Sequence, residues 1–315
     1  MDLVTMGETM AAFAPEEDGR LRYASSFRLR VAGAESNVAV GAARLGFSAG
    51  WISRVGADEF GQKILRELRA DGVDVSAVAV DEDRRTGLLF KETRPGGETA
   101  VTYYRAGSAA SALSLDGRAR EQLRGARIVH LTGITPALGE SCAQAVREAV
   151  SIAHESGAAV SFDPNIRRKL WGSRDFVFPV RSLAVQAVYV LLGREEAELL
   201  YGPLSPRELF GALARCGRLR ALALKDGARG ALVLSREELH EIPPFPCACV
   251  DPVGAGDAFD AGFLCASLEG LPLRDCGRWG AVLGAKATET RGDTDGYLSR
   301  RELEACLRRE TEITR

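Results

Sequence analysis

Short apolar runs alternate along the chain with longer segments in which apolar residues recur every three or four positions. The short runs carry almost no charge, which is typical of strands buried on both faces of a sheet. The longer segments have the period of amphipathic helices. The expected core strands are Leu3 to Met6, Gly50 to Val55, Ile128 to Thr132, Ala159 to Phe162, Val188 to Leu192 and Ala221 to Leu224. This alternation predicts an α/β protein whose helices cover a mostly parallel sheet.

Three of the expected helices are closed by a glycine, the residue that most readily adopts the left-handed conformation after a helix. They are Glu35 to Leu45 before Gly46, Glu59 to Asp71 before Gly72, and Glu140 to Ser156 before Gly157. The glycine at each point indicates where the helix ends and the chain turns back toward the sheet.

Residues 86–105 break the alternation of strands and helices. This segment is rich in β-favouring residues on both sides of Pro95-Gly96-Gly97, so it predicts an antiparallel hairpin. A second stretch, Leu21 to Val31, alternates apolar and polar residues and is expected to pair with the hairpin. We therefore expect a single domain over residues 1–315, in which segments at about 10–32 and 85–108 form a small β-sheet lid over a cleft.

The charge balance indicates what kind of ligand the protein binds, and the cysteines indicate the cellular compartment in which it is found. The 41 basic and 43 acidic residues nearly balance and form no long run of one sign, which favours a small-molecule ligand over nucleic acid or a membrane surface. The seven cysteines are scattered and odd in number, as free thiols of a cytoplasmic protein are. Asp2 and Glu8 do not suit a signal peptide, and the longest uncharged apolar stretch, 182–193, is too short to span a bilayer.

The segment most informative about chemistry is Asp251-Pro-Val-Gly-Ala-Gly-Asp257-Ala-Phe-Asp-Ala-Gly-Phe. Gly254 and Gly256 leave the backbone free to turn its amides toward one point, and the apolar run from Ala258 predicts a helix that starts there. Amides converging at a helix N-terminus form an anion hole suited to a phosphoryl group in transfer. Asp257 stands beside that hole as a candidate general base. The alternative is a plain glycine-rich loop in which Asp257 caps the helix.

This thirteen-residue string resembles the C-terminal signature of the ribokinase-like (PfkB) carbohydrate kinases, and the resemblance extends from residue 3 to about residue 300. It implies a three-layer α/β sandwich with a β lid, a sugar bound between lid and sheet, and the use of ATP with Mg²⁺. It also implies that Gly254, Ala255 and Gly256 form the anion hole, that Asp257 is the base, and that two copies could associate through the lid. The chain lacks the P-loop and Rossmann glycine motifs, which disfavours other nucleotide-binding families.

The same resemblance implies a nucleotide site and a metal-associated residue. Lys225-Asp-Gly-Ala-Arg-Gly230 resembles the family's strand and turn beside the nucleotide, although a plain hairpin turn has the same composition. Glu196 occupies the last position of the family's Asn-x-x-Glu motif, which is associated with Mg²⁺, and Gly193 replaces the asparagine. The alternative for Glu196 is an exposed acid in the first turn of a helix. The implied nucleotide contacts are Asn165, Arg167, Gly193, Lys225, Asp226, Gly227, Gly230, Gly254, Ala255, Gly256 and Asp257.

Three further segments resemble family members that phosphorylate 2-keto-3-deoxygluconate. They begin at Ala32, Tyr103 and Asp163. The resemblance implies ATP-dependent phosphorylation of that sugar acid at its C6 hydroxyl, giving 2-keto-3-deoxy-6-phosphogluconate and ADP. The implied substrate contacts are Gly33, Ala34, Asn37, Leu89, Tyr103, Arg105, Arg167, Asp257 and Asp293.

An acidic sugar is also favoured by the residues themselves. Two arginines in one pocket, Arg105 and Arg167, suit a carboxylate, because a guanidinium offers a planar pair of donors. Alternatively, Arg105 lies at the tip of the lid hairpin without contacting the ligand, and Arg167 contacts only the ATP phosphates. Two other functions therefore stay open: a kinase for a neutral sugar such as fructose or ribose, and a non-catalytic sensor of sugar acids.

Overall fold

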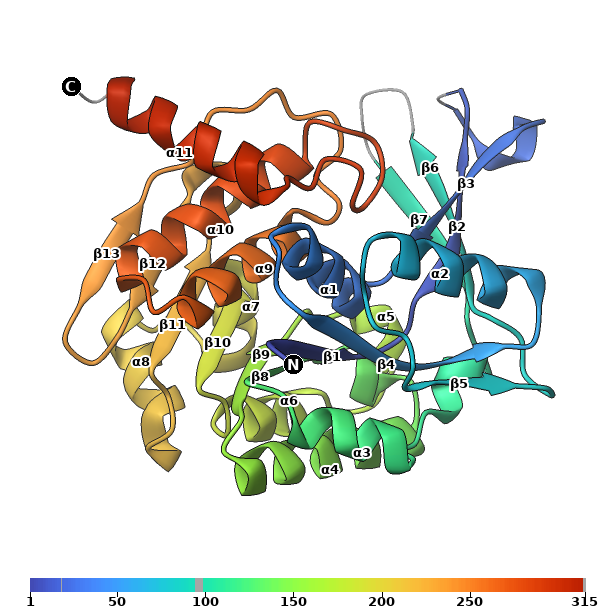
Figure 1. Cartoon of the computed structure of the whole chain (residues 1–315), viewed down its shortest axis with the longest axis horizontal. Coiled ribbons are helices and arrows are strands. Elements are labelled where there is room, and N and C mark those ends of the chain that lie inside the picture. Colours follow the sequence, from blue (N-terminus) through green and yellow to red (C-terminus); the bar gives the residue numbers. More distant parts are fainter. Residues whose placement is uncertain (18, 94–98, 314–315) are drawn as a thin grey trace.

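The computed structural model describes residues 1–17, 19–93 and 99–313. A nine-stranded sheet forms the middle layer, with helices on both faces (Figure 1). Its strand order is β13-β12-β11-β10-β9-β8-β1-β4-β5. The strands are β1 (Leu3–Met6), β4 (Ala49–Gly56), β5 (Val78–Asp81), β8 (Ile128–Thr132), β9 (Ala159–Asp163), β10 (Tyr189–Gly193), β11 (Ala221–Lys225), β12 (Ala231–Leu234) and β13 (Leu239–Ile242).

Parallel pairing runs through most of this large sheet. β1 is an interior strand, third from the β5 edge, and pairs in parallel with β4 on one side and β8 on the other. Among the described strands of this sheet only β12 runs in the opposite direction, so it pairs antiparallel with both of its neighbours, β11 and β13. All four residues of β1 are buried, as expected for a strand covered on both faces. The predicted α/β class and the mostly parallel sheet are therefore confirmed.

Two hydrophobic cores lie on the two faces of the large sheet. One is closed by α1 (Ala34–Arg44), α2 (Glu59–Ala70), α9 (Ala255–Leu268), α10 (Leu273–Ala287) and α11 (Arg300–Ile313). The other is closed by α3 (Gly117–Arg124), α4 (Glu140–Ser156), α6 (Val177–Ala184), α7 (Arg194–Tyr201) and α8 (Pro206–Leu213), and the short α5 (Arg168–Trp171) lies beside it. In the described part of the chain, no helix is long and apolar enough to cross a membrane.

The three glycines expected to end helices do so in the left-handed conformation. The φ angles of Gly46, Gly72 and Gly157 are +89°, +84° and +79°. The helix before Gly157 has the predicted bounds at both ends, and the bounds of the other two differ from the prediction by at most one residue at either end. These glycines therefore mark the points at which α1, α2 and α4 end.

A second, small sheet stands beside the large one, with strand order β3-β2-β6-β7 (Figure 1). Its strands are β2 (Met10–Pro15), β3 (Phe27–Ala32), β6 (Leu88–Thr93) and β7 (Thr99–Tyr104). The antiparallel hairpin of β6 and β7 is confirmed. Its predicted turn, Pro95-Gly96-Gly97, lies outside the described residues.

Two expectations about this small sheet were wrong. The stretch from Leu21 to Val31 is not one strand, because Leu21–Tyr23 forms a 3₁₀ turn and the strand begins at Phe27. That strand also does not pair with the hairpin: β2 lies between them, antiparallel to β3 and parallel to β6. The sequence of β2 does not indicate a strand clearly, since three of its six residues are alanines, which are uncommon in strands.

The small sheet has two different faces, because side chains alternate along each strand. Met10, Ala12, Ala32 and Leu89 form an apolar cluster on the face turned toward the large sheet. The opposite face carries an aromatic cluster in which the rings of Phe13 and Phe90 stack with centroids 5.0 Å apart. Phe27 and Tyr104 extend this cluster by edge-to-face contacts with Phe90. The first face forms a wall of the cleft described next.

Candidate active site

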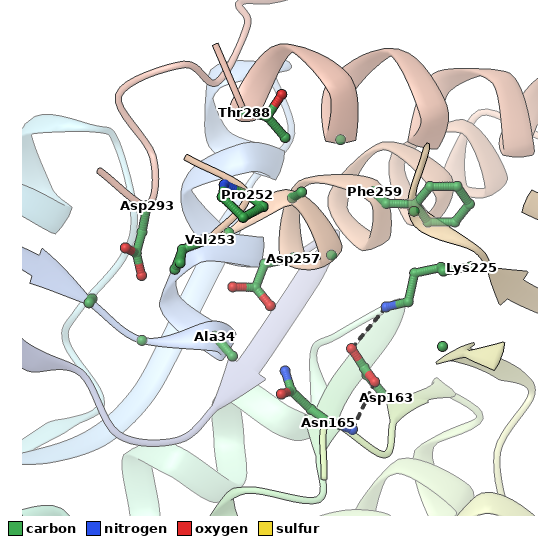
Figure 2. Close-up of a pocket in the computed structure, with 18 of the residues that line it drawn as sticks. Ala34, Asp163, Asn165, Lys225, Pro252, Val253, Asp257, Phe259, Thr288 and Asp293 are labelled. Carbon is green, nitrogen blue, oxygen red and sulfur yellow. Dashed lines mark hydrogen bonds and ion pairs between the residues drawn. The ribbon is translucent and has the colours of Figure 1, made fainter. Parts of the chain in front are cut away.

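A cleft of about 790 Å³ lies between the small sheet and the carboxyl ends of the large sheet's strands. Asp163, Gly193 and Lys225 are the last residues of β9, β10 and β11, and all three line it. Open α/β sheets bind ligands at this edge, where the strand ends and the following loops converge. The N-terminus of α9 approaches the same cleft from above the sheet (Figure 2).

Most of the residues predicted to bind substrate or nucleotide line this one cleft. They are Gly33, Ala34, Leu89, Tyr103, Arg105, Asn165, Arg167, Gly193, Glu196, Lys225, Gly227, Gly230, Gly254, Ala255, Gly256, Asp257 and Asp293. Two predicted residues do not. Asn37 is buried behind Asp257, and the carboxylate of Asp226 pairs outside the cleft with Arg194 and Arg229.

The start of α9 has the geometry expected of an anion hole. Gly254 precedes the helix with a φ of +85°, and a Cβ at this position would lie 2.4 Å from the carbonyl oxygen of Asp293, so only glycine fits. In the described chain the amides of Gly256 and Asp257 donate to no backbone or side-chain acceptor. They are first-turn amides, at the positive end of the helix dipole. The site therefore offers free donors to an anion.

Gly256 provides a direct test of this anion hole. A Cβ at position 256 would meet only the Lys225 Nζ, at 3.7 Å, so a side chain fits the fold but enters the cleft in front of the amides. Gly256→Val is expected to keep its circular dichroism spectrum while losing about a hundredfold in kcat/KM for ATP. Gly117→Val is a matched control, because Gly117 begins α3 with open space around it. Unchanged ATP kinetics in a folded Gly256→Val protein would place phosphate binding elsewhere.

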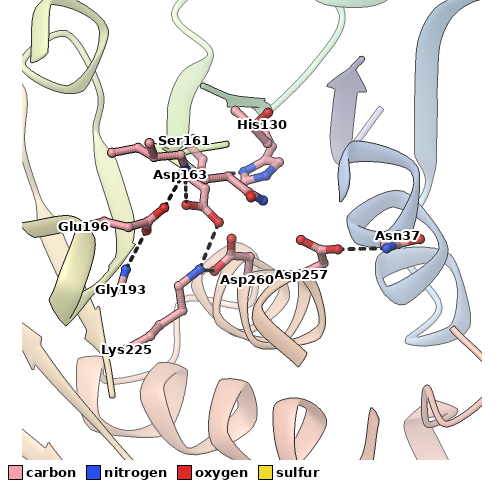
Figure 3. Close-up of polar contacts among 12 residues, drawn as sticks. Asn37, His130, Ser161, Asp163, Gly193, Glu196, Lys225, Asp257 and Asp260 are labelled. Atoms are coloured by element: carbon pink, nitrogen blue, oxygen red, sulfur yellow. Dashed lines mark hydrogen bonds and ion pairs between the residues drawn. The ribbon is translucent and has the colours of Figure 1, made fainter. Parts of the chain in front are cut away.

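Asp257 faces the cleft from the first turn of α9, half-buried. Its Oδ2 accepts a hydrogen bond of 2.8 Å from the Asn37 side-chain amide (Figure 3). The same amide also reaches Asp293 Oδ2 at 3.4 Å. Removal from water raises the pKa of Asp257 to about 7; the Asn37 bond opposes this rise, and the negative charges of Asp163 and Asp293 add to it. A carboxyl with this pKa can take up a proton near neutral pH.

A cluster of charged side chains next to Asp257 is centred on Lys225. Lys225 Nζ donates to Asp163 Oδ2 at 3.0 Å and to Asp260 Oδ1 at 2.9 Å (Figure 3). Burial by itself lowers the pKa of Lys225, but the two carboxylates more than offset this and hold that pKa above its ordinary value. Burial raises the pKa of Asp260 well above the ordinary value, whereas the Lys225 cation keeps that of Asp163 low. One cation, Lys225, is therefore shared between two buried carboxyl groups.

Glu196 joins two loops of the cleft through backbone amides. Its Oε1 accepts from the Ile166 amide at 2.6 Å and its Oε2 from the Gly193 amide at 2.9 Å. Asn165, next to Ile166, adopts a φ of +37°, and its amide donates to Asp163 Oδ1. Among the described residues no group of three or more metal-binding side chains is assembled. A single carboxylate suits Mg²⁺, which keeps several waters and binds mainly to substrate phosphates.

The cationic side chains that line the cleft differ in how many of their donors are already paired. Arg105 is buried and paired with Glu8, a residue that our sequence reading placed in no site. Lys91 on β6, also missed, pairs with Asp293 at 2.6 Å. Arg167 is exposed and pairs with no side chain in the described part of the chain. Arg167 is thus the cation of the cleft with the most open donors.

The two glycines of the turn after β11 have different reasons to be glycine. Gly230 has a φ of +89°, and a Cβ there would lie 2.1 Å from the carbonyl oxygen of Ile242 on β13. Its lack of a side chain is therefore needed for the sheet. Gly227 has a φ of +54° and open space around its Cβ position, so it leaves room at the cleft for a ligand.

A proton acceptor facing free helix amides, in a cleft large enough for a sugar and a nucleotide, is the arrangement of a small-molecule kinase. The sequence matches the pfkB family of carbohydrate kinases over residues 1–300. The chain belongs to this family, which confirms the resemblance seen in the sequence.

Individual relatives are similar over almost their full length. A 2-dehydro-3-deoxygluconokinase of Bacillus subtilis (strain 168) is 38% identical, over 98% of this chain and 95% of its own. A 2-dehydro-3-deoxygalactonokinase of Haloferax volcanii is 35% identical, over 98% and 96%. Among solved structures, a putative ribokinase II of Escherichia coli in complex with ATP and Mg²⁺ superposes with a TM-score of 0.90 at 25% identity, over 98% of this chain and 99% of that one.

Proposed function

We propose that this protein is an ATP-dependent kinase that phosphorylates 2-keto-3-deoxygluconate, also called 2-dehydro-3-deoxygluconate, at its C6 hydroxyl. The products are 2-keto-3-deoxy-6-phosphogluconate and ADP. The observation that carries this proposal is the position of Asp257, whose side chain is held by Asn37 and faces the cleft beside the free amides of α9. Its pKa, raised to about 7, suits the exchange of a proton near neutral pH. Relatives at 38% and 35% identity that bear the names of sugar-acid kinases support the choice of substrate.

The proposed reaction is a single phosphoryl transfer. The C6 oxygen attacks the γ-phosphorus of ATP, and the bond from that phosphorus to the β,γ-bridging oxygen breaks as ADP leaves. The hydroxyl proton passes to the Asp257 carboxylate. The amides of Gly256 and Asp257 face the charge that spreads over the transferred group, since helix N-termini stabilise phosphates. A sensor without catalysis would need neither the base nor these free amides.

The nucleotide would occupy the end of the cleft formed by Gly227, Lys225 and the start of α9. ATP and Mg²⁺ in the superposed ribokinase II structure support this choice of phosphate donor and metal. Mg²⁺, when bound, neutralises phosphate charge and helps align the transferred group. Glu196 would hold it through water, because both carboxylate oxygens already accept backbone amides.

The sugar would lie against the inner face of the small sheet, which we infer acts as a lid. Leu89 and Tyr103 line the cleft from that sheet, and Gly33 and Ala34 from the chain that leaves it. A Cβ at Gly33 would lie 2.5 Å from the Glu8 carbonyl oxygen, so this approach requires glycine. Arg105 and Arg167 would contact the carboxylate of the sugar acid, supported by their place on the cleft wall.

Variants of Arg105 test the choice of an acidic sugar. A charge-assisted hydrogen bond contributes about 1.5 to 3 kcal/mol, so Arg105→Ala is expected to lower kcat/KM for 2-keto-3-deoxygluconate by about ten- to a hundredfold. Fructose, which has no carboxylate, should lose much less. Arg105→Lys should recover only part of the loss, because an ammonium lacks the planar fork.

The measurement is kcat/KM by coupled ADP detection for 2-keto-3-deoxygluconate, its galacto epimer and fructose, in wild type and both variants. A wild type that prefers fructose, or an Arg105→Ala enzyme slowed equally on all three sugars, would favour the neutral-sugar kinase instead. The epimer shows how far the active site distinguishes the orientation of a single hydroxyl.

We also infer a cytoplasmic enzyme that associates through the small sheet. All seven cysteines are free, which supports a reducing compartment. The aromatic outer face of the small sheet leaves Tyr104 and Phe27 65% and 36% exposed. Aromatic patches of this kind favour protein contacts, and a second copy of the chain is the simplest self-complementary partner.

A further inference from the structure

A buried carboxylate, Glu8, holds the arginine that we propose contacts the sugar acid. Glu8 lies between β1 and β2, and its side chain is fully buried. Its Oε2 accepts from Arg105 Nε at 2.6 Å, with Nη2 of the same guanidinium at 2.5 Å. Its Oε1 accepts from the Ser108 hydroxyl at 2.6 Å. One carboxylate from the start of the chain therefore fixes a segment about a hundred residues later.

These contacts leave Arg105 with donors to spare. A guanidinium carries five N–H donors, and Glu8 occupies the edge formed by Nε and Nη2. The Tyr103 ring lies over the same group, with 5.5 Å between the ring centroid and Arg105 Cζ. The N–H groups that remain belong to the side of the guanidinium away from Glu8, and Arg105 lines the cleft. Its orientation there is set by Glu8 rather than by the ligand.

Glu8 cannot itself act on a substrate. Both of its oxygens are engaged by Arg105 and Ser108, and no part of its side chain is exposed. Its charge nevertheless balances that of Arg105, so the pair brings little net positive charge to the cleft. Attraction of an anion to this point must then depend on directed hydrogen bonds more than on unpaired charge.

We propose that Glu8 is a positioning residue that orients Arg105 toward the substrate carboxylate and thereby sets the preference for sugar acids over neutral sugars. This rests on the proposed function, in which Arg105 contacts that carboxylate. Glu8 acts only through Arg105. Removing its charge frees the guanidinium to rotate, and the geometry for the acid is lost while the nucleotide end of the cleft is unchanged.

The test is a double-mutant cycle of Glu8→Gln and Arg105→Ala, with kcat and KM measured for 2-keto-3-deoxygluconate, fructose and ATP. Glu8→Gln is expected to raise KM for the acid about tenfold and to change kcat and KM for ATP by less than about threefold. Because Glu8 acts through Arg105, adding Glu8→Gln to Arg105→Ala should change KM for the acid little further. Glu121→Gln, an exposed position on α3, is the matched control.

Two results would overturn the proposal: equal losses on acid and neutral sugar in Glu8→Gln, or a double variant whose loss is the product of the single losses. If Glu8→Gln does not fold, Ser108→Ala removes only the Oε1 bond and should shift KM for the acid in the same direction by a smaller factor. A wild type that prefers fructose would refute the proposed substrate. The cycle run on fructose would still show whether Glu8 acts through Arg105.

Discussion

Replacing Asp257 by asparagine is expected to lower kcat by about two to four orders of magnitude, the range for loss of a general base. Asparagine has the same shape and can still accept the hydrogen bond from Asn37, but it cannot take up the hydroxyl proton. KM for ATP and for the sugar should therefore stay close to wild type. Initial rates at saturating substrate, together with ATP binding by calorimetry, make the measurement.

The pH profile provides an independent check on the same residue. Burial raises the pKa of Asp257 to about 7, so its carboxyl is protonated and inactive as a base below that pH. In wild type, kcat/KM should fall about tenfold for each pH unit on the acid side of this value and level off on the alkaline side. A flat profile between about pH 5.5 and 8.5, or an Asp257→Asn enzyme that keeps most of its rate, would remove Asp257 from the role of base.

Replacing Lys225 by methionine is expected to lower the free energy of unfolding by about 3 to 5 kcal/mol near pH 8. The substitution keeps the volume of the side chain but leaves the carboxyl groups of Asp163 and Asp260 buried without their cation. Lys225 also lines the cleft, at the end that we propose holds the nucleotide, so activity should fall as well. Urea unfolding followed by tryptophan fluorescence gives the free energy directly.

The dependence of this loss on pH distinguishes a charge effect from a packing effect. Without Lys225, burial raises the pKa of Asp163 in the folded state, so ionisation at high pH opposes folding. The deficit should be greatest near pH 8 and shrink as the pH falls through the raised pKa. Lys63→Met, which breaks a helical pair with Glu67 on α2, should cost less than about 1 kcal/mol at either pH. A Lys225→Met deficit that does not vary with pH would indicate lost packing instead.

The sequence predicts the fold well where the local signal is strong. The buried strands near the middle of the large sheet carry short, largely apolar runs, and Gly46, Gly72 and Gly157 mark the ends of helices whose bounds were predicted to within a residue or two. The signal fails where residues are small or neutral in propensity, as in the alanine-rich β2. The order in which the strands of the small sheet pair could not be predicted from the sequence either, because it depends on contacts between segments that are far apart in the chain.

For the candidate site, the sequence identified residues better than relationships between them. Gly254 and Asp257 stand in a recognisable string, and both lie at the cleft. Asp260 lies one helical turn after Asp257 in an otherwise apolar helix, a pattern that could have marked it as a buried acid with a partner. Glu8 follows an apolar strand without any such pattern, and its pairing with Arg105 joins residues 97 positions apart. Such a pairing is set by the packing of the whole chain.

The interior position of β1 affects the order in which the sheet can form while the chain is synthesised on the ribosome. The first strand to be synthesised has two neighbours in the sheet, and the second of them, β8, is complete only at Thr132. The helix that carries Asp257 is synthesised much later and must then dock against α1. There Asp257 bonds to Asn37, which lies 220 residues earlier in the sequence. A nascent chain interrupted before α9 would contain the small sheet but would lack the amides and the carboxylate that we propose bind phosphate and act as the base. Truncated products of this chain should therefore be inert rather than partly active.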